Sequence, residues 1–305
     1  MIAARDLTKH FQNVTAINGL NCNIPDGCIY GLVGVNGAGK STLLRLMSGI
    51  YRPDGGSICV DGGNIFEHPE AKAKVALVPD ELFFLSGSNL FDMADLYAAA
   101  YRHFDRKRFA ELMGQFRLDG KKPLAAFSKG QRRQAATILA LSAGTNYILF
   151  DETFDGLDPV MRNLVKNVLY SDVTDRGITA VVTSHSLREL EDTCDQLSLL
   201  YEGTLVYEGD AENLRTSLFK MQVAFRDTFD QSKFSELDLV HFEKSGSVAS
   251  IIVRGDQKRA CKLVQDMQPV LMEQLPMTLE EVFLYEMETM GYAFPMETAK
   301  GGDDK

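Results

Sequence analysis

The stretch GVNGAGKST, residues 34–42, decides the fold of this 305-residue chain. It matches the pattern GxxxxGK[ST], in which glycines let the backbone turn tightly and aim N–H groups at phosphate oxygens. The apolar run 28–33 precedes it, and apolar residues at helical spacing follow it over 40–50. In this strand–loop–helix context, Lys40 is expected at the β- and γ-phosphates and the Ser41 hydroxyl at Mg²⁺. The predicted phosphate-binding residues are Gly34, Asn36, Gly37, Ala38, Gly39, Lys40, Ser41 and Thr42.

A second apolar run, predicted to be a strand, ends in two adjacent acidic residues. The run YILFDE, residues 147–152, ends in Asp151 and Glu152. Ligands bind at the carboxyl ends of parallel strands in an α/β sheet. We therefore expect Asp151 to hold the Mg²⁺ shell and Glu152 to act as general base toward an attacking water.

Three further motifs each have an ordinary structural explanation. Ser128 and Gln131 of FSKGQ form a predicted capping box, which also leaves a helix N-terminus open to an anion. Asp158 before Pro159 is a typical helix start. His185 follows the strand ITAVVTS and precedes another predicted capping box over 186–189, and it lies at the same sheet edge as the carboxylates.

The composition argues against a nucleic-acid-binding protein and against a chain that spans a membrane. The chain has 32 Lys and Arg against 42 Asp and Glu, so its formal net charge is −10, which argues against a nucleic-acid partner. No secretory signal and no run of about 20 apolar residues is present. We therefore expect a soluble chain, whose membrane role would need a partner subunit. The five cysteines show no metal or disulfide spacing and indicate a reducing cytoplasm.

The chain divides into two expected domains, 1–215 and 216–305. In the first, the short apolar runs 146–150 and 178–183 predict buried parallel strands, and residues 88–118 predict helix. In the second, a hairpin over 240–253, a helix near 256–268 and a helix capped at Thr278 predict a small α+β domain. The tail KGGDDK is expected to be disordered.

Taken in order, these motifs resemble those of ATP-binding cassette proteins. GxxxxGKST, SKGQ, ILFDE, GLDP and a histidine ending a later strand match the nucleotide-binding subunit of an ABC transporter over roughly residues 2–215. The C-terminal domain resembles the tail of stand-alone bacterial exporter-type subunits. The resemblance implies a P-loop NTPase of ABC type, α/β, with a mixed sheet core, an antiparallel β-subdomain and a helical subdomain, plus a small C-terminal α+β domain.

The resemblance also implies roles for residues outside the phosphate loop. Phe11 falls where the family places an aromatic ring that stacks on adenine. Ser128, Gly130 and Gln131 match the signature motif, which contacts the γ-phosphate of ATP on the opposite subunit, although Lys129 departs from the usual glycine. Asp158 would act across that head-to-tail interface. His185 would position the γ-phosphate and the water.

Asp80 is the clearest departure from the family. In LVPD, residues 77–80, it replaces a glutamine that touches Mg²⁺ and the attacking water in family enzymes. A carboxylate can ligate Mg²⁺, but it also brings negative charge close to a triphosphate. Two readings stay open: Asp80 takes over the role of the glutamine, or it is a plain turn residue.

The implied function is ATP hydrolysis in a dimer, homo- or heteromeric, that drives transport through a separate integral membrane permease. Export is the expected direction, and the expected place is the cytoplasm, peripheral at the inner face of the plasma membrane. Residues 82–118 would meet the permease, and the apolar residues Phe83, Phe84 and Leu85 in this segment are either core or a socket for a partner helix. The alternative is a non-transport ABC ATPase with a regulatory role, or one that acts on ribosomes or DNA.

Overall fold

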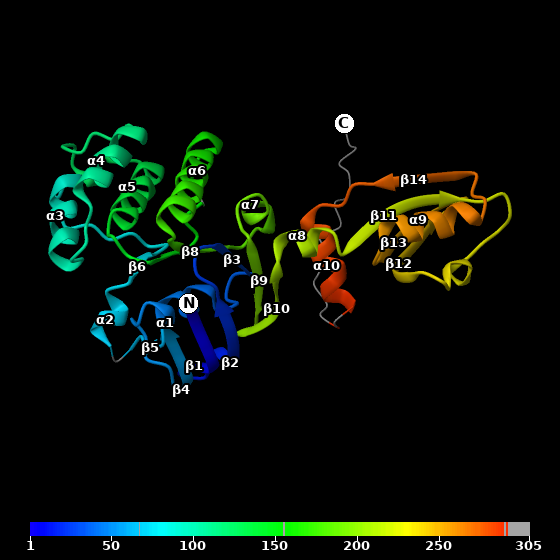
Figure 1. Ribbon diagram of the computed structural model, residues 1–305, viewed down its shortest axis with the longest axis horizontal. Coiled ribbons are helices and arrows are strands. Elements are labelled where there is room, and N and C mark those ends of the chain that lie inside the picture. The colour runs from blue at the N-terminus through cyan, green and yellow to red at the C-terminus, as the bar shows by residue number, and fades with distance from the viewer. Residues whose placement is uncertain (67, 155, 290, 292–305) are drawn as a thin grey trace. The chain divides into compact units, whose positions relative to one another are not determined.

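The computed structural model describes residues 1–66, 68–154, 156–289 and 291. The chain forms two compact units, which divide between Asp210 and Ala211, and each has its own hydrophobic core (Figure 1). The boundary expected after residue 215 falls at the end of helix α8 (Ala211–Arg215).

A six-stranded sheet in the order β10-β9-β3-β8-β7-β6 forms the centre of the first unit. The five strands from β9 to β6 run parallel, and β10 is antiparallel to β9. Every residue of β3, β7 and β8 is buried, as continuous apolar runs predict for strands covered on both faces. The strands are β3 (Ile29–Val33), β6 (Val75–Val78), β7 (Tyr147–Phe150), β8 (Thr179–Ser184), β9 (Gln196–Tyr201) and β10 (Thr204–Asp210).

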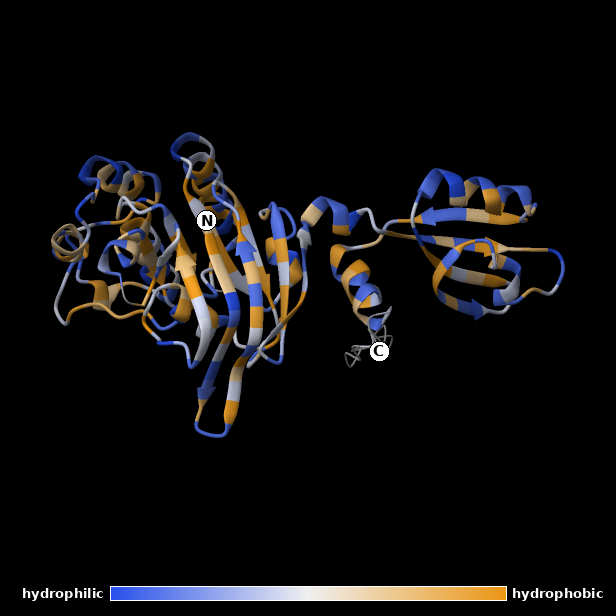
Figure 2. Cartoon of the chain, turned by 60° about the horizontal axis from the view of Figure 1, so that its bottom comes forward, coloured by the Kyte–Doolittle hydropathy of each residue, from blue (hydrophilic) through white to orange (hydrophobic). Residues whose placement is uncertain are grey.

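A second, antiparallel sheet in the order β2-β1-β4-β5 covers helix α1 (Lys40–Met47). Hydrophobic and hydrophilic residues alternate along these strands (Figure 2). In β2, for example, Leu20, Cys22 and Ile24 are buried while the residues between them are exposed. The buried face shares one core with Leu43 and Leu46 of α1. The strands are β1 (Ile2–Phe11), β2 (Val14–Ile24), β4 (Gly55–Val60) and β5 (Gly63–Asn64).

The stretch predicted to be helical, 88–118, is helical in two pieces rather than one. Residues 82–89 form no helix, and two helices follow, α3 (Leu90–Ala100) and α4 (Arg106–Gln115). Each has its own start: Asn89 and Asp92 form a capping box, and the Asp105 carboxylate accepts the N–H groups of residues 107 and 108. The apolar pattern continues across the break because both helices pack on α5 (Lys129–Leu141).

Helix α6 (Pro159–Arg176) begins at Asp158 as predicted and ends at Gly177, which adopts a left-handed conformation (φ 64°). The capping box predicted over 186–189 is wrong. The Ser186 side chain makes no capping bond to α7 (Leu187–Leu190). Instead the Ser184 hydroxyl donates to Glu189 at 2.7 Å and accepts the Ser186 N–H at 3.0 Å. The short helix α2 is Pro69–Lys72 and the 3₁₀ turn η1 is Leu124–Ala126.

The second unit is an antiparallel sheet in the order β12-β13-β11-β14 with helix α9 (Gln257–Asp266) against one face. The predicted hairpin is confirmed, and so is the capping box between Thr278 and Glu281 at the start of α10 (Leu279–Thr289). The tail KGGDDK lies outside the described residues. The remaining elements are β11 (Leu218–Ala224), η2 (Gln231–Phe234), β12 (Asp238–Ser245), β13 (Val248–Arg254) and β14 (Leu271–Leu275). No helix in the described parts of the chain is long and apolar enough to cross a bilayer.

Candidate nucleotide site

Parallel pairing brings the ends of four strands to one edge of the central sheet. Val33 pairs with Ser184, Phe150 with Val182, and Val78 with Phe150. The residues that follow these strands are Gly34, Asp80, Asp151, Glu152 and His185. The register therefore gathers the predicted site residues at the place where α/β sheets bind ligands.

The loop between β3 and α1 has a backbone that requires glycine. At Gly39, φ is +109°, and a Cβ would come within 2.5 Å of the Ala16 carbonyl oxygen. A Cβ on Gly34 would meet the Leu200 carbonyl oxygen at 2.5 Å. The loop thus passes tightly under neighbouring backbone and then enters α1, whose first N–H groups have no intrahelical partner. These groups and the helix dipole favour an anion at this end of α1.

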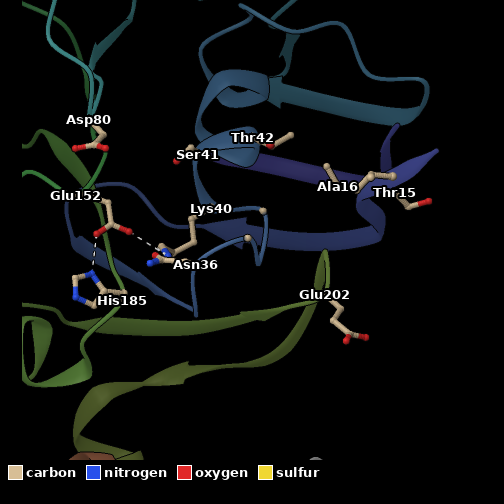
Figure 3. A pocket seen from close by; sticks show the side chains of 13 residues that line it. Thr15, Ala16, Asn36, Lys40, Ser41, Thr42, Asp80, Glu152, His185 and Glu202 are labelled. Atoms are coloured by element: carbon tan, nitrogen blue, oxygen red, sulfur yellow. Dashed lines mark hydrogen bonds and ion pairs between the residues drawn. The ribbon is translucent and has the colours of Figure 1, made fainter. Parts of the chain in front are cut away.

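Lys40 lies almost completely buried at the start of α1. Its Nζ donates to the carbonyl oxygens of Gly34 at 2.6 Å and Val35 at 3.3 Å. It also forms an ion pair with Glu152, at 3.1 Å from Oε1 (Figure 3). The ammonium is therefore fixed in the middle of the loop rather than extended into solvent.

Asp151 is buried, and its carboxylate is bonded to helix α1 and to strand β8. Its Oδ1 accepts the hydroxyls of Ser41 and Thr183, each at 3.0 Å. Mg²⁺ in NTPase sites takes one or two protein oxygens together with phosphates and water. The Ser41 hydroxyl and the Asp151 carboxylate are hard oxygen ligands that fit this requirement.

Glu152 is held at both its backbone and its side chain. Its N–H donates to the Thr183 hydroxyl at 2.9 Å, and its φ of 50° is unusual for a residue with a side chain. Its Oε2 lies 2.9 Å from Nδ1 of His185 (Figure 3). Lys40 and His185 therefore contact the two oxygens of one carboxylate.

These residues surround a cavity of about 680 Å³, within the usual range for small-molecule sites. The predicted residues that line it are Asn36, Gly37, Gly39, Lys40, Ser41, Thr42, Asp80, Glu152 and His185. Four further lining residues, which the sequence did not indicate, are Val14, Thr15, Ala16 and Glu202. Gly34, Ala38 and Asp151 lie behind this surface, and Asp151 is linked to it through Ser41.

Phe11 does not line this cavity. It ends β1, and its ring packs edge-on against Tyr51 with a centroid separation of 5.2 Å. The wall of the cavity nearest to it in sequence comes from Val14, Thr15 and Ala16. Stacking of adenine on Phe11 therefore stays a prediction.

Ser128, Gly130, Gln131 and Asp158 line a different cavity, of about 450 Å³. The predicted capping box is confirmed: Ser128 and Gln131 each accept the backbone N–H of the other, at 3.1 and 3.2 Å. Asp158 caps α6 by accepting two N–H groups. The N-termini of α5 and α6 therefore line one cavity together, and none of these four residues lines the cavity around Lys40.

Sequence reasoning missed two residues that position the site. Thr183 bonds both Asp151 and Glu152, and its one signal is a hydroxyl near the end of a buried strand, beside Ser184. Arg133 of α5 donates from Nη2 to Asp80 Oδ1 at 2.5 Å. Nothing in the local pattern connects these two residues, because the contact depends on how α5 packs beside β6.

Comparison with known proteins decides the family. Residues 17–155 match the ABC transporter family. The daunorubicin/doxorubicin resistance ATP-binding protein DrrA of Streptomyces peucetius is 31% identical over 224 residues, which are 71% of this chain and 67% of that protein. The chain belongs to the ABC transporter family. The ABC transporter ATP-binding protein YtrB of Bacillus subtilis is 29% identical over 284 residues, 93% of this chain and 97% of YtrB.

Solved structures of ABC cassettes share the fold. An ATP-binding subunit of an ABC transporter superposes with a TM-score of 0.65 at 24% identity, over 70% of this chain and 92% of that structure. A dimeric bacterial ABC transporter cassette gives 0.63 at 22% identity, over 69% and 99%. The predicted ABC-type P-loop fold is confirmed, and the second unit is an addition to it. This chain is an ABC ATPase, an ATP-binding subunit that couples ATP hydrolysis to transport.

Proposed function

We propose that this ABC ATPase hydrolyses ATP in the cavity between the phosphate loop and Glu152, in a head-to-tail dimer that drives export through a separate membrane permease. The observation that carries the proposal is the contact of the Glu152 carboxylate with both Lys40 and His185. It places a base, a cation and a histidine around one point at the start of α1.

Lys40 binds the β- and γ-phosphates, which replace the Glu152 carboxylate as its partner. Glu152 then accepts a hydrogen bond from the attacking water and acts as general base. His185, 2.9 Å from Glu152, orients this carboxylate and contacts the γ-phosphate.

Ser41 and Asp151 would hold Mg²⁺, because their oxygens are hard ligands and already lie 3.0 Å apart at the start of α1. The ion would neutralise charge on the phosphate oxygens. Thr183 keeps Asp151 turned toward Ser41 by donating to the same carboxylate oxygen.

The second cavity supports the dimer. Ser128, Gly130, Gln131 and Asp158 lie at two helix N-termini that line no part of the Lys40 cavity. They would instead close over the ATP of a second subunit, because a helix N-terminus favours an anion. ABC cassettes of this fold form dimers, as one of the similar structures shows. Whether the second subunit is identical is left to experiment.

The family and its relatives support export and a place at the inner face of the membrane. Relatives named for resistance to daunorubicin and doxorubicin and for bacitracin transport match at 31% and 29% identity. A relative named for methionine import matches at 26%. A cassette of similar fold is described as part of an ABC transporter complex.

Purification of the tagged chain from detergent-solubilised membranes tests the proposal. A polytopic membrane protein should copurify in stoichiometric amount and raise the ATPase activity. The same purification from cells that express Lys40→Met should retain the membrane protein but not the activity. Copurification of ribosomes or DNA in place of a membrane protein would contradict a transport role.

A further inference from the structure

Asp80 places a carboxylate at the edge of the nucleotide cavity, and this charge needs compensation. The residue follows β6 and lines the cavity that Lys40 and Glu152 also line. Its side chain is about half exposed (53%). A carboxylate facing this cavity would repel the triphosphate that the proposed function places there.

The same side chain also lines a smaller cavity, of about 250 Å³, on its other side. Three cationic residues, Lys129, Arg132 and Arg133, lie in the wall of that cavity. All three come from the first turns of α5. The carboxylate therefore stands between a site for an anion and a group of cations.

One of these cations holds it. Arg133 Nη2 lies 2.5 Å from Asp80 Oδ1, and the Arg133 side chain is only 2% exposed. Its Nε and Nη1 are also buried, and they make no hydrogen bond within the described residues. Among those residues, Asp80 is the carboxylate that compensates the Arg133 charge. Removing one partner from such a pair leaves a buried charge without compensation, which is strongly unfavourable.

The cost of breaking this ion pair argues against direct contact of Asp80 with Mg²⁺, the role that the family's glutamine has. If Asp80 turned into the nucleotide cavity to ligate Mg²⁺, its contact with Arg133 would break and leave a buried guanidinium without compensation. As the partner of Arg133 it stays where it is, and its charge is cancelled before a triphosphate binds. The second arrangement needs no uncompensated charge at any stage.

We propose that Arg133 is a positioning residue of the nucleotide site, which holds the Asp80 carboxylate and neutralises it so that ATP can bind beside it. The proposal rests on the proposed function, since it assumes that ATP occupies the Lys40 cavity. It assigns to Asp80 no direct contact with Mg²⁺. It also explains why an acidic residue is tolerated at the edge of a site for a polyanion.

Equilibrium binding of a fluorescent ATP analogue to the full chain tests this role. Arg133→Met should weaken binding roughly tenfold at low salt, the scale of one uncompensated charge near the ligand, and less in high salt. Adding Asp80→Asn to Arg133→Met should restore affinity to near that of the wild type, because the exposed charge is then gone. Arg133→Lys should keep most of the affinity. The matched control is Arg132→Met, which removes the same charge from the same small cavity without touching Asp80.

A purely structural role for Arg133 predicts a different pattern. Arg133→Met and the double variant would then bind ATP equally poorly, and this result would overturn the proposal. A Mg²⁺ requirement for ATPase activity that rises several-fold in the double variant would also overturn it, because Asp80 would then be a metal ligand. Circular dichroism and the melting temperature of each variant show whether it folds.

The proposed nucleotide site is tested separately by Lys40→Met. If that variant binds ATP as well as the wild type does, the site itself is misassigned. If Lys40→Met loses ATP and Arg133→Met does not, the site stands and only the role of Arg133 fails.

Discussion

The carboxylate of Glu152 lies 3.1 Å from the ammonium of Lys40. Glu152 is the proposed base and Lys40 the proposed phosphate ligand. Because they form an ion pair, each compensates the charge of the other. A bound triphosphate needs the same ammonium, and its oxygens would take the place of the carboxylate. Binding of ATP would thereby free Oε1 of Glu152 for the attacking water, while Oε2 keeps its contact with His185. Occupation of the site would in this way activate the base.

Glu152→Gln should abolish turnover while ATP still binds. The amide keeps the size of the side chain but cannot accept a proton, so we expect kcat to fall by about 10²–10⁴-fold. If the proposed dimer opens only after hydrolysis, this variant should accumulate as an ATP-bound dimer in size-exclusion chromatography with light scattering. ATPase activity close to that of the wild type would show that Glu152 is not the base.

Lys40→Met should weaken ATP binding by roughly tenfold or more, because a buried cation among carbonyl groups is lost. Calorimetry on the full chain measures the dissociation constant. Lys107→Met is the matched control, since it removes the same charge from a side chain on α4 that is 89% exposed. Equal losses in both variants would point to a general effect of net charge.

The site could be predicted from sequence where it depends on contiguous residues. The phosphate loop, the pair Asp151–Glu152 and the capping box of Ser128 each occupy a few neighbouring positions, so their local geometry follows from residue type. Parallel pairing then fixes which strand ends meet, and this places His185 beside Glu152.

Contacts that depend on how helices pack could not be predicted in this way. Arg133 meets Asp80 across 53 positions of sequence, and helical periodicity shows only that this face of α5 is buried. The break between α3 and α4 was missed because the apolar pattern runs on through it. The contact of the Phe11 ring with Tyr51 also has no sequence signal, and stacking of adenine on Phe11 stays a prediction.

Ser41→Ala should raise the Mg²⁺ concentration that gives half-maximal ATPase activity by roughly tenfold or more. The hydroxyl that bonds Asp151 is lost, and with it one proposed metal ligand. Ser48→Ala is a control at the C-cap of the same helix, because its hydroxyl bonds only the Arg45 carbonyl oxygen among the described residues. A Mg²⁺ titration that is the same for both variants would rule out Ser41 as a ligand.

Ser128→Ala should have two separable effects, because Ser128 is both a helix cap and a proposed ligand of ATP on the opposite subunit. Loss of the cap should lower the free energy of unfolding by about 1 kcal/mol. Asn89→Ala removes a capping box of the same kind from α3 and should destabilise the protein by a similar amount. Only Ser128→Ala should also weaken the ATP-dependent dimer, measured by light scattering in the Glu152→Gln background. If both variants weaken the dimer equally, stability alone accounts for the effect and Ser128 has no role across the interface.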